Sequence, residues 1–373
     1  MMKLVVFHPA LTPYRVDLFN KLSLLCELKV VFLQNNNLSQ TFDNNQLLKN
    51  ACFDYEFLTN GFAIGRLYFR SGIFKLLRRY KPDVVISHEY FGVSFQLLFV
   101  NLLSINYKHL IWTAENPSIA QSHSKIRNFI KKVFFRFVDG VVCYSEDLFE
   151  WYTKFLGYSG KLYLLPNLPD ENIFRNDIIN ATSHAEKFVK KYNLVGKRIL
   201  LYVGRLSAEK NVESLVQSFA KSSFQRNDCV LIIVGNGILL SSISKLIDEL
   251  NLSNSIILNG SAFGRDLYSF YRFSELFILP SLFEPYGAVV NEALISGIPV
   301  ICSDQVGAKI LISTSNGEIY SLINQDLTDV LNEWYERIPR VSLPLRENSP
   351  SLHPYNLDQI AGNFINALKN MPN

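Results

Sequence analysis

The sequence predicts an α/β fold made of two Rossmann-like, doubly wound domains, and three observations lead to this prediction. The chain has 373 residues, whereas a single hydrophobic core rarely grows beyond about 250–300 residues. Hydrophobic residues make up 48% of the chain and charged residues 19%, which is typical of globular proteins. Short β-branched runs alternate with helical patterns in two series, which indicates two parallel sheets covered by helices.

The first series occupies the N-terminal half. The runs typical of strands are 4–7, 29–33, 83–87, 109–113, 140–144 and 161–165, and residues 16–25 are typical of a helix. The longest apolar stretch, 90–105, is interrupted by polar residues and is shorter than the roughly 20 residues that a membrane-spanning helix needs. We therefore expect it to be a buried helix of the first domain.

The alternation pauses at a turn cluster, 166–170, which is followed by a polar stretch, 176–184. This pause predicts two domains, residues 1–175 and 176–373. The second series follows, with strands expected at 199–203, 230–234, 256–259, 276–279 and 299–302. Residues 340–354 are loop-like, and 357–368 form a helical pattern that we expect to pack back on the N-terminal domain. Because ligands of doubly wound sheets bind outside the carboxyl ends of the strands, functional residues are expected just after strands, around a central cleft.

Charge and cysteine usage indicate the setting. Residues 1–175 carry 20 Lys and Arg against 14 Asp and Glu, a net charge of +6, so the remainder carries 17 against 19, a net charge of −2. The basic half is a candidate for meeting an anionic surface. The five cysteines form no C-x-x-C pair and no secretory signal is visible, which favours a reducing cytoplasm.

The first chemical motif follows the strand at 199–203. Gly204 allows a tight turn, and two cations suited to phosphate, Arg205 and Lys210, come after it. A helix beginning near Asn211 would add the attraction of its N-terminal dipole for an anion. A solvated loop with ordinary charges is the alternative.

The second motif follows the strand at 276–279. Pro285 is suited to the first position of a helix, so the amides of Tyr286, Gly287, Ala288 and Val289 would point into the cleft. Glu284 precedes this helix and Glu292 lies about two turns inside it. Because the two carboxylates lie at different positions along the helix, one can accept hydrogen bonds from the hydroxyls of a sugar and the other from those of a ribose. Alternatively, both are ordinary helix-forming or dipole-favouring residues.

Together these residues resemble the donor domain of family 4 retaining glycosyltransferases (glycosyl transferases group 1). The resemblance rests on Gly204-Arg205-Leu206 with Glu209-Lys210-Asn211, Glu284-Pro285-Tyr286-Gly287 with Glu292-Ala293-Leu294, Ser296-Gly297-Ile298-Pro299-Val300, and Leu165-Pro166-Asn167 ahead of Asp170. It implies a GT-B fold, a nucleoside-diphosphate sugar as donor, and transfer with retention of configuration. By similarity, Arg205 and Lys210 would hold the diphosphate, Glu284 the sugar hydroxyls and Glu292 the ribose, and no metal or other cofactor would be needed.

The sequence departs from this family in three places. The first loop lacks the usual glycines, and Tyr14 and Arg15 are candidates for the acceptor side; Arg15 supplies either a phosphate contact or a structural salt bridge. Glu115 stands near the place where many members have a His, as a catalytic or a structural residue. His88 is another candidate on the acceptor side, although a lone His is more often structural. Gly307 stands where members often show two glycines and a later Glu.

Two basic stretches contain no acidic residue: Arg66, Arg70, Lys75, Arg78, Arg79 and Lys81, and then Lys125, Arg127, Lys131, Lys132 and Arg136. In the second, apolar residues recur at helical spacing, so we expect a helix that packs its apolar side on the sheet and presents a basic side. That basic side is either merely solvated or contacts an anionic membrane at the inner face of the cell. No nucleic-acid recognition motif accompanies the charge.

Three other hypotheses are weighed against transfer to a lipid-linked or growing glycan. An epimerase acting on the nucleotide sugar would need an acid/base pair, which is not evident. A dinucleotide-dependent oxidoreductase would need G-x-G-x-x-G, but the run after Val234 has Gly235 and Gly237 and then Leu240. A catalytically inactive scaffold is disfavoured by the intact Arg205, Lys210, Glu284 and Glu292.

Overall fold

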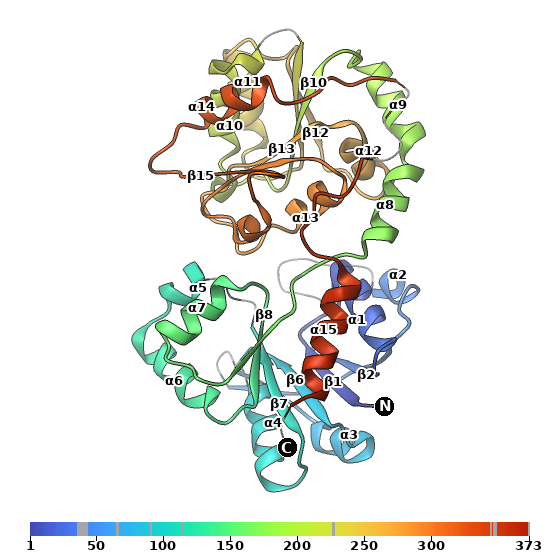
Figure 1. Cartoon of the computed structure of the whole chain (residues 1–373), viewed down its shortest axis with the longest axis vertical. Coiled ribbons are helices and arrows are strands. Elements are labelled where there is room, and N and C mark those ends of the chain that lie inside the picture. The colour runs from blue at the N-terminus through green and yellow to red at the C-terminus, as the bar shows by residue number, and fades with distance from the viewer. Residues whose placement is uncertain are drawn as a thin grey trace. The chain divides into compact units, whose positions relative to one another are not determined.

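The computed structural model describes residues 1–35, 44–64, 67–89, 92–113, 115, 117–225, 228–343, 345 and 349–371. It divides into two compact units, Met1–Asp170 with Tyr355–Asn373, and Glu171–Pro354. Each unit contains a parallel sheet with helices packed against it (Figure 1). This is the two-domain Rossmann-like α/β fold that the alternating pattern predicts.

Unit 1 is built on a parallel sheet with the strand order β3-β2-β1-β6-β7-β8-β9. Its strands are β1 (Lys3–His8), β2 (Glu27–Phe32), β3 (Asp54–Phe57), β6 (Val84–His88), β7 (Lys108–Trp112), β8 (Gly140–Cys143) and β9 (Lys161–Leu164). A separate antiparallel hairpin is formed by β4 (Gly61–Ile64) and β5 (Leu67–Arg70). Its helices are α1 (Pro13–Ser23), α2 (Asn44–Leu48), α3 (Ile73–Tyr80), α4 (Gly92–Leu103), α5 (Pro117–Ser122), α6 (Lys125–Phe135), α7 (Asp147–Lys154) and α15 (Leu357–Lys369).

Both faces of this sheet are buried, as expected for parallel strands that read as continuous apolar runs. On one face Val5 and Val85 pack against Leu77 of α3 and Leu97 of α4. On the other, Phe19 of α1 lies against Phe32, with ring centroids 6.5 Å apart.

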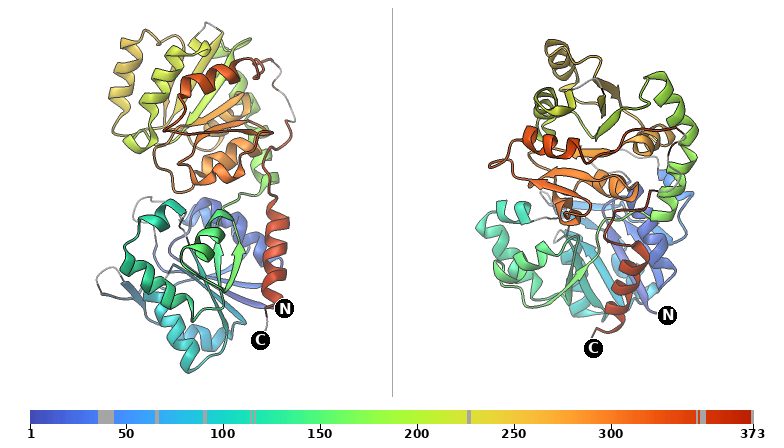
Figure 2. Two further views of the ribbon diagram at one scale, coloured as in Figure 1. Left: turned by 60° about the vertical axis from the view of Figure 1, so that its left-hand side comes forward. Right: turned by 45° about the horizontal axis from the view of Figure 1, so that its top comes forward.

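The C-terminal helix α15 belongs to unit 1, where it lies beside α1 (Figures 1 and 2). Phe364 contacts Tyr163 of β9 at 6.1 Å between ring centroids. An ion pair of 2.5 Å joins Asp358 to Lys21. Apolar packing and this pair therefore hold the end of the chain on the first unit.

Unit 2 repeats the same order of strands, β12-β11-β10-β13-β14-β15, all parallel. The strands are β10 (Arg198–Val203), β11 (Cys229–Val234), β12 (Ile256–Gly260), β13 (Leu276–Leu279), β14 (Val300–Ser303) and β15 (Gly317–Tyr320). The helices are α8 (Glu171–Asn180), α9 (Thr182–Lys191), η1 (Ala208–Lys210), α10 (Val212–Lys221), η2 (Ser223–Gln225), α11 (Leu240–Glu249), α12 (Arg265–Phe273), α13 (Ala288–Ile295), η3 (Gly307–Leu311) and α14 (Leu327–Tyr335).

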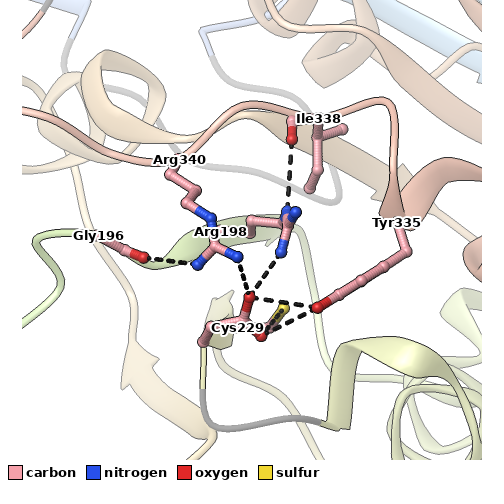
Figure 3. Close-up of polar contacts among 7 residues, drawn as sticks. Gly196, Arg198, Cys229, Tyr335, Ile338 and Arg340 are labelled. Atoms are coloured by element: carbon pink, nitrogen blue, oxygen red, sulfur yellow. Dashed lines mark hydrogen bonds and ion pairs between the residues drawn. The ribbon is translucent and has the colours of Figure 1, made fainter.

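A polar cluster ties the segment after α14 to the start of the unit 2 sheet (Figure 3). Asp228 Oδ2 accepts from Arg198 Nη1 at 2.6 Å and lies 2.7 Å from Arg340 Nη2. The Tyr335 hydroxyl donates to the same carboxylate at 3.2 Å, and its ring centroid lies 4.3 Å from the Arg198 guanidinium carbon. The cluster lies where β10 and β11 begin. It therefore holds the segment after α14 at the amino ends of these strands, opposite the carboxyl ends where a ligand is expected.

Three sequence expectations for the fold are wrong. The polar stretch 176–184, which predicts the domain boundary, is instead part of α8 and α9 of unit 2, which bury Phe174, Ile178 and Val189. The apolar stretch 90–105 contains α4, but only one side of that helix is buried, because Phe99, Leu102 and Leu103 are each about two-thirds exposed. Among the described residues, no helix is long and apolar enough to cross a membrane.

The third correction concerns α6. The sequence predicts that its apolar residues pack on the sheet, yet Ile126, Phe129, Ile130 and Val133 are exposed. Conversely, Lys131, expected on the basic surface, is fully buried. Helical spacing shows that one side of a helix is apolar, but it does not show which side meets the rest of the protein.

Candidate active site

The predicted donor residues lie at the topological switch point of unit 2. The strand order reverses direction between β10 and β13, and ligands of doubly wound sheets bind outside the carboxyl ends of the strands at this point. The loop after β10 contains Gly204, Arg205 and Lys210, and the loop after β13 contains Glu284. Two segments 74 residues apart in the chain are thereby brought together.

The loop after β10 rests on the loop after β11. Leu206 donates its amide to Asn236 O at 2.9 Å, and Gly204 donates to Val234 O at 3.0 Å. A Cβ at Gly235 would lie 1.8 Å from Gly204 O, and one at Gly237 would lie 2.2 Å from Leu206 O. Close backbone packing therefore accounts for the glycines that gave the incomplete dinucleotide motif.

Lys210 and Glu284 form a direct ion pair. Lys210 ends η1 and is only 7% exposed, and its Nζ donates to Glu284 Oε2. Asn211 follows in the left-handed region at φ 57° and donates its side-chain amide to Pro280 O at 3.2 Å. The amide of Leu282 also donates to Glu209 O, at 2.8 Å. These backbone and side-chain contacts hold the two loops against each other.

Arg205 lies in a different environment from Lys210. Its side chain is 71% exposed, and its Nη2 lies 3.3 Å from Glu209 Oε1. The same Glu209 oxygen accepts a hydrogen bond of 2.6 Å from Ser207 Oγ. Of the two cations that the sequence predicts for phosphate, one is buried and paired with a site carboxylate, while the other is held at the surface.

Helix α13 begins later than the sequence predicts. Pro285 is not its first residue: the helix runs from Ala288, after Gly287 at φ 93°. Glu284 forms a parallel β-bridge with Val306, and its carbonyl accepts from Gly307 at 3.0 Å. That bridge holds Glu284 outside the helix, and Gly287, with its positive φ, leads the chain into the helix.

The predicted amide cradle of Tyr286, Gly287, Ala288 and Val289 therefore spans a turn and the first turn of α13 rather than one continuous helix. Amides in a first turn lack intrahelical acceptors. A Cβ at Gly307 would lie 2.2 Å from Pro285 O. Gly307 therefore allows η3 to approach this turn closely.

Glu292 lies inside α13 and receives a hydrogen bond of 2.7 Å from the hydroxyl of Tyr271 on α12. Burial raises the pKa of Glu292 to about 7, and the Tyr271 hydrogen bond acts in the opposite direction. This carboxyl group therefore titrates near neutral pH. Tyr271 could not be recognised as a partner of Glu292 from sequence, because it is one of several aromatic residues of an amphipathic helix.

Unit 1 has its own switch point, between β1 and β6. Arg15 is almost completely buried there, with its guanidinium carbon 4.1 Å from the Trp112 ring centroid, and it donates to the Tyr144 hydroxyl. Burial and then the charge of Arg15 lower the pKa of His88 to about 3. Arg15 is thus held against the rings of Trp112 and Tyr144, contacts that the sequence did not indicate.

His88 and Tyr14 are the other candidates for the acceptor side, and the structure describes the side chain of His88 alone of these two. His88 ends β6, and its ring centroid lies 5.1 Å from that of His8. Tyr14 lies within α1, but its side chain is outside the described residues.

Glu115 is held in a buried polar cluster of unit 1. It accepts from Lys131 Nζ, lies 3.2 Å from the Tyr152 hydroxyl, and has His123 Nδ1 at 3.3 Å. Burial lowers the pKa of Lys131, and the charge of Glu115 opposes that shift. These contacts support the structural alternative for Glu115. The sequence offered no sign that Lys131 points inward.

Two kinds of comparison with known proteins agree with this geometry. Residues 184–336 match the family model described as Glycosyl transferases group 1. Among solved structures, the chain resembles the Anabaena protein Alr3699/HepE in complex with UDP and glucose, with a TM-score of 0.63 and 16% identity, over 99% of this chain and 97% of that one. The expected GT-B fold and the group 1 resemblance are therefore confirmed.

Two curated relatives illustrate the sequence similarity. An uncharacterized glycosyltransferase of Methanocaldococcus jannaschii is 29% identical over 62% of this chain and 58% of its own length. The N-acetylgalactosamine-N,N'-diacetylbacillosaminyl-diphospho-undecaprenol 4-alpha-N-acetylgalactosaminyltransferase of Campylobacter jejuni is 34% identical over 29% of this chain and 28% of its own. The chain thus matches little more than half the length of the first relative and about a quarter of the second.

Proposed function

Because residues 184–336 carry a glycosyl transferases group 1 domain, we propose that this protein transfers a sugar from a nucleoside-diphosphate sugar to a lipid-linked or growing glycan acceptor. Anomeric configuration is retained, and no metal takes part. The observation that carries the proposal is the Lys210–Glu284 ion pair at the switch point of the unit 2 sheet. It combines a cation for a diphosphate with a carboxylate for sugar hydroxyls.

The proposed chemistry assigns a separate task to each group. Lys210 stabilises the negative charge that grows on the leaving diphosphate, and the amides at the start of α13 face the same charge. Glu284 accepts hydrogen bonds from the sugar hydroxyls, and Glu292 from the ribose. Glu284 is paired with Lys210, so a donor that binds both residues exchanges this internal contact for contacts of its own.

Two findings on similar proteins support the donor and acceptor classes. The Anabaena neighbour binds UDP and glucose, and the Campylobacter relative is named for a diphospho-undecaprenol acceptor and an alpha linkage. On this basis we propose a lipid-linked acceptor for this chain, and a location in the cytoplasm at the inner face of the cell membrane.

The direct test is to incubate the protein with UDP-, GDP- and ADP-sugars and to measure the nucleoside diphosphate released, with and without lipid-linked acceptors. Release that increases with an acceptor is expected. If the donor is converted to another nucleotide sugar without release of nucleoside diphosphate, the protein is an epimerase and not a transferase. The absence of both reactions with every donor would contradict the proposal.

Calorimetry with free UDP or GDP tests which part of the donor Glu284 and Glu292 each bind. Glu284→Ala should abolish transfer yet keep nucleoside diphosphate binding, because Glu284 is assigned to the sugar. Glu292→Ala should weaken the nucleotide itself. If Glu284→Ala loses the nucleotide and Glu292→Ala keeps it, the two assignments are wrong.

A further inference from the structure

Helix α6 of unit 1 presents a row of apolar side chains to solvent. Ile126 is 74% exposed, Phe129 67%, Ile130 46%, Val133 38% and Phe137, just beyond the helix, 55%. These positions recur every three or four residues, so they lie along one side of the helix. Contiguous exposed apolar patches on a protein surface mark interaction sites, whereas single exposed residues do not.

The row is held in place by the buried side of the same helix. Phe134 and Phe135 belong to a core cluster with Trp151 and Tyr152. Lys131 is fully buried against Glu115. The side chain of Ser124 caps the helix by accepting from the Arg127 amide at 3.2 Å. The outward position of the apolar row therefore follows from how α6 is anchored.

Helix α4 also carries exposed apolar side chains. It contacts α6 through Phe95 and Phe134, whose ring centroids are 4.8 Å apart. Phe99, Leu102 and Leu103 of α4 are exposed. Two neighbouring helices thus both carry solvent-facing apolar side chains.

Cations accompany the apolar row. Lys125, Arg127, Lys132 and Arg136 are all exposed, and the sequence has no Asp or Glu between Glu115 and Asp139. An apolar side flanked by Lys and Arg is the pattern of a helix that lies in the plane of a membrane interface. The long stems of Lys and Arg let their charges reach headgroup phosphates while the apolar side chains lie deeper.

We propose that α6 docks unit 1 on an anionic lipid bilayer by inserting this apolar row below the headgroups. A bilayer supplies both an apolar interior and negative charge. A second copy of the chain paired through the same surface would bring like charges together, which is unfavourable. The docking gives the proposed function its lipid-linked acceptor and rests on that function for its role, but the binding itself is measurable without any transfer.

Vesicle co-sedimentation of the full chain tests the docking, with phosphatidylcholine vesicles compared with vesicles containing phosphatidylglycerol. Binding should be at least about tenfold stronger to the anionic vesicles. Replacing Phe129, Ile130 and Val133 by Ser should weaken it by about tenfold or more at low salt, where the cations remain. Replacing Lys125, Lys132 and Arg136 by Ser should weaken it comparably. Lys131 is left unchanged, because it is buried.

Two controls separate insertion from unfolding and from charge alone. Val195→Ser with Ile323→Ser removes exposed apolar side chains of unit 2 and should leave vesicle binding unchanged. Phe129→Trp should give a fluorescence blue shift with anionic vesicles and be quenched by lipids brominated along the acyl chain. Unchanged emission would mean that the helix does not insert, and the proposal would fail.

Other outcomes also decide. Equal binding to both kinds of vesicle, or binding to neither, contradicts the docking. A dimer detected by light scattering that the Phe129, Ile130 and Val133 replacements dissociate would identify a second copy as the occupant instead. Nucleoside diphosphate release with a detergent-solubilised acceptor is measured in parallel. If the protein binds vesicles but releases no nucleoside diphosphate, only the proposed function is contradicted. If it releases nucleoside diphosphate but does not bind vesicles, only the docking is contradicted.

Discussion

The two sheets have the same strand order around their switch points, yet polar residues at these points are used differently. In unit 2, Lys210 and Glu284 meet each other after β10 and β13. In unit 1, Arg15 is enclosed by Trp112 and Tyr144 after β1, and Glu115, after β7, is bound to Lys131. The comparison teaches that a position after a strand makes a residue a candidate, and that its contacts decide which role can be proposed for it.

The largest expected effect tests the unit 2 side of this comparison. Lys210→Ala should lower turnover by about 10²-fold or more, because it removes a cation that faces developing charge. Arg205→Ala should cause a smaller loss, because the Arg205 side chain lies exposed beside Glu209. Steady-state kinetics checks both, with Lys245→Ala, an exposed lysine paired to Glu249, as the control. Near-wild-type turnover in Lys210→Ala would refute the assignment.

The second effect tests unit 1. Glu115→Ala leaves the buried Lys131 without its carboxylate, which should cost about 3–5 kcal/mol of stability. Urea unfolding measures this loss. Glu115→Leu combined with Lys131→Met removes both charges and should restore most of it.

Turnover of that double variant separates a structural from a catalytic Glu115. If the residue is structural, the refolded double variant keeps activity close to wild type. Activity that stays about 10²-fold reduced in a stable double variant would return Glu115 to the catalytic role that the family resemblance suggested.

The same contrast explains how much the sequence could predict. Central parallel strands such as β1 and β10 are continuous apolar runs because both faces are buried, and the sequence predicts them well. The edge strands β3 and β15 are not predicted, because Asp-Tyr-Glu-Phe and Gly-Glu-Ile-Tyr are short and interrupted by acidic residues, so neither is a continuous apolar run. The donor motifs are local in sequence and were found. The partners of Arg15, Glu115 and Glu292 come from distant segments and could not be inferred without contacts.

A third prediction concerns Glu292, whose pKa burial raises to about 7. Because its pKa is raised in the folded protein, Glu292 contributes to folding stability while its carboxyl group is neutral. This contribution is complete below the pKa of the unfolded chain, near 4.5, and is lost as the pH rises through about 7. If the ribose hydroxyls donate to Glu292, the nucleotide prefers the ionised form, so UDP or GDP affinity should rise up to about tenfold between pH 6 and pH 8.

Calorimetry at both pH values measures this rise, and Glu292→Gln should abolish it. Tyr271→Phe serves as the matched variant, because it removes the Tyr271 hydrogen bond, which opposes the raised pKa of Glu292. It should move the midpoint of the affinity change to higher pH. An affinity that does not depend on pH in the wild type would separate Glu292 from the ribose.

The smallest expected effect is that of metal removal. The chain has no Asp-x-Asp triplet to bridge a metal to a diphosphate. Instead, the buried ammonium of Lys210 and the first-turn amides of α13 supply positive charge at the proposed diphosphate site. If these groups suffice, nucleoside diphosphate release should be unchanged in excess EDTA, and added Mg²⁺ or Mn²⁺ should not raise it. If EDTA abolishes nucleoside diphosphate release and Mn²⁺ restores it, Lys210 and the first-turn amides do not suffice to stabilise the leaving diphosphate. Lys210 would then share this role with a metal ion.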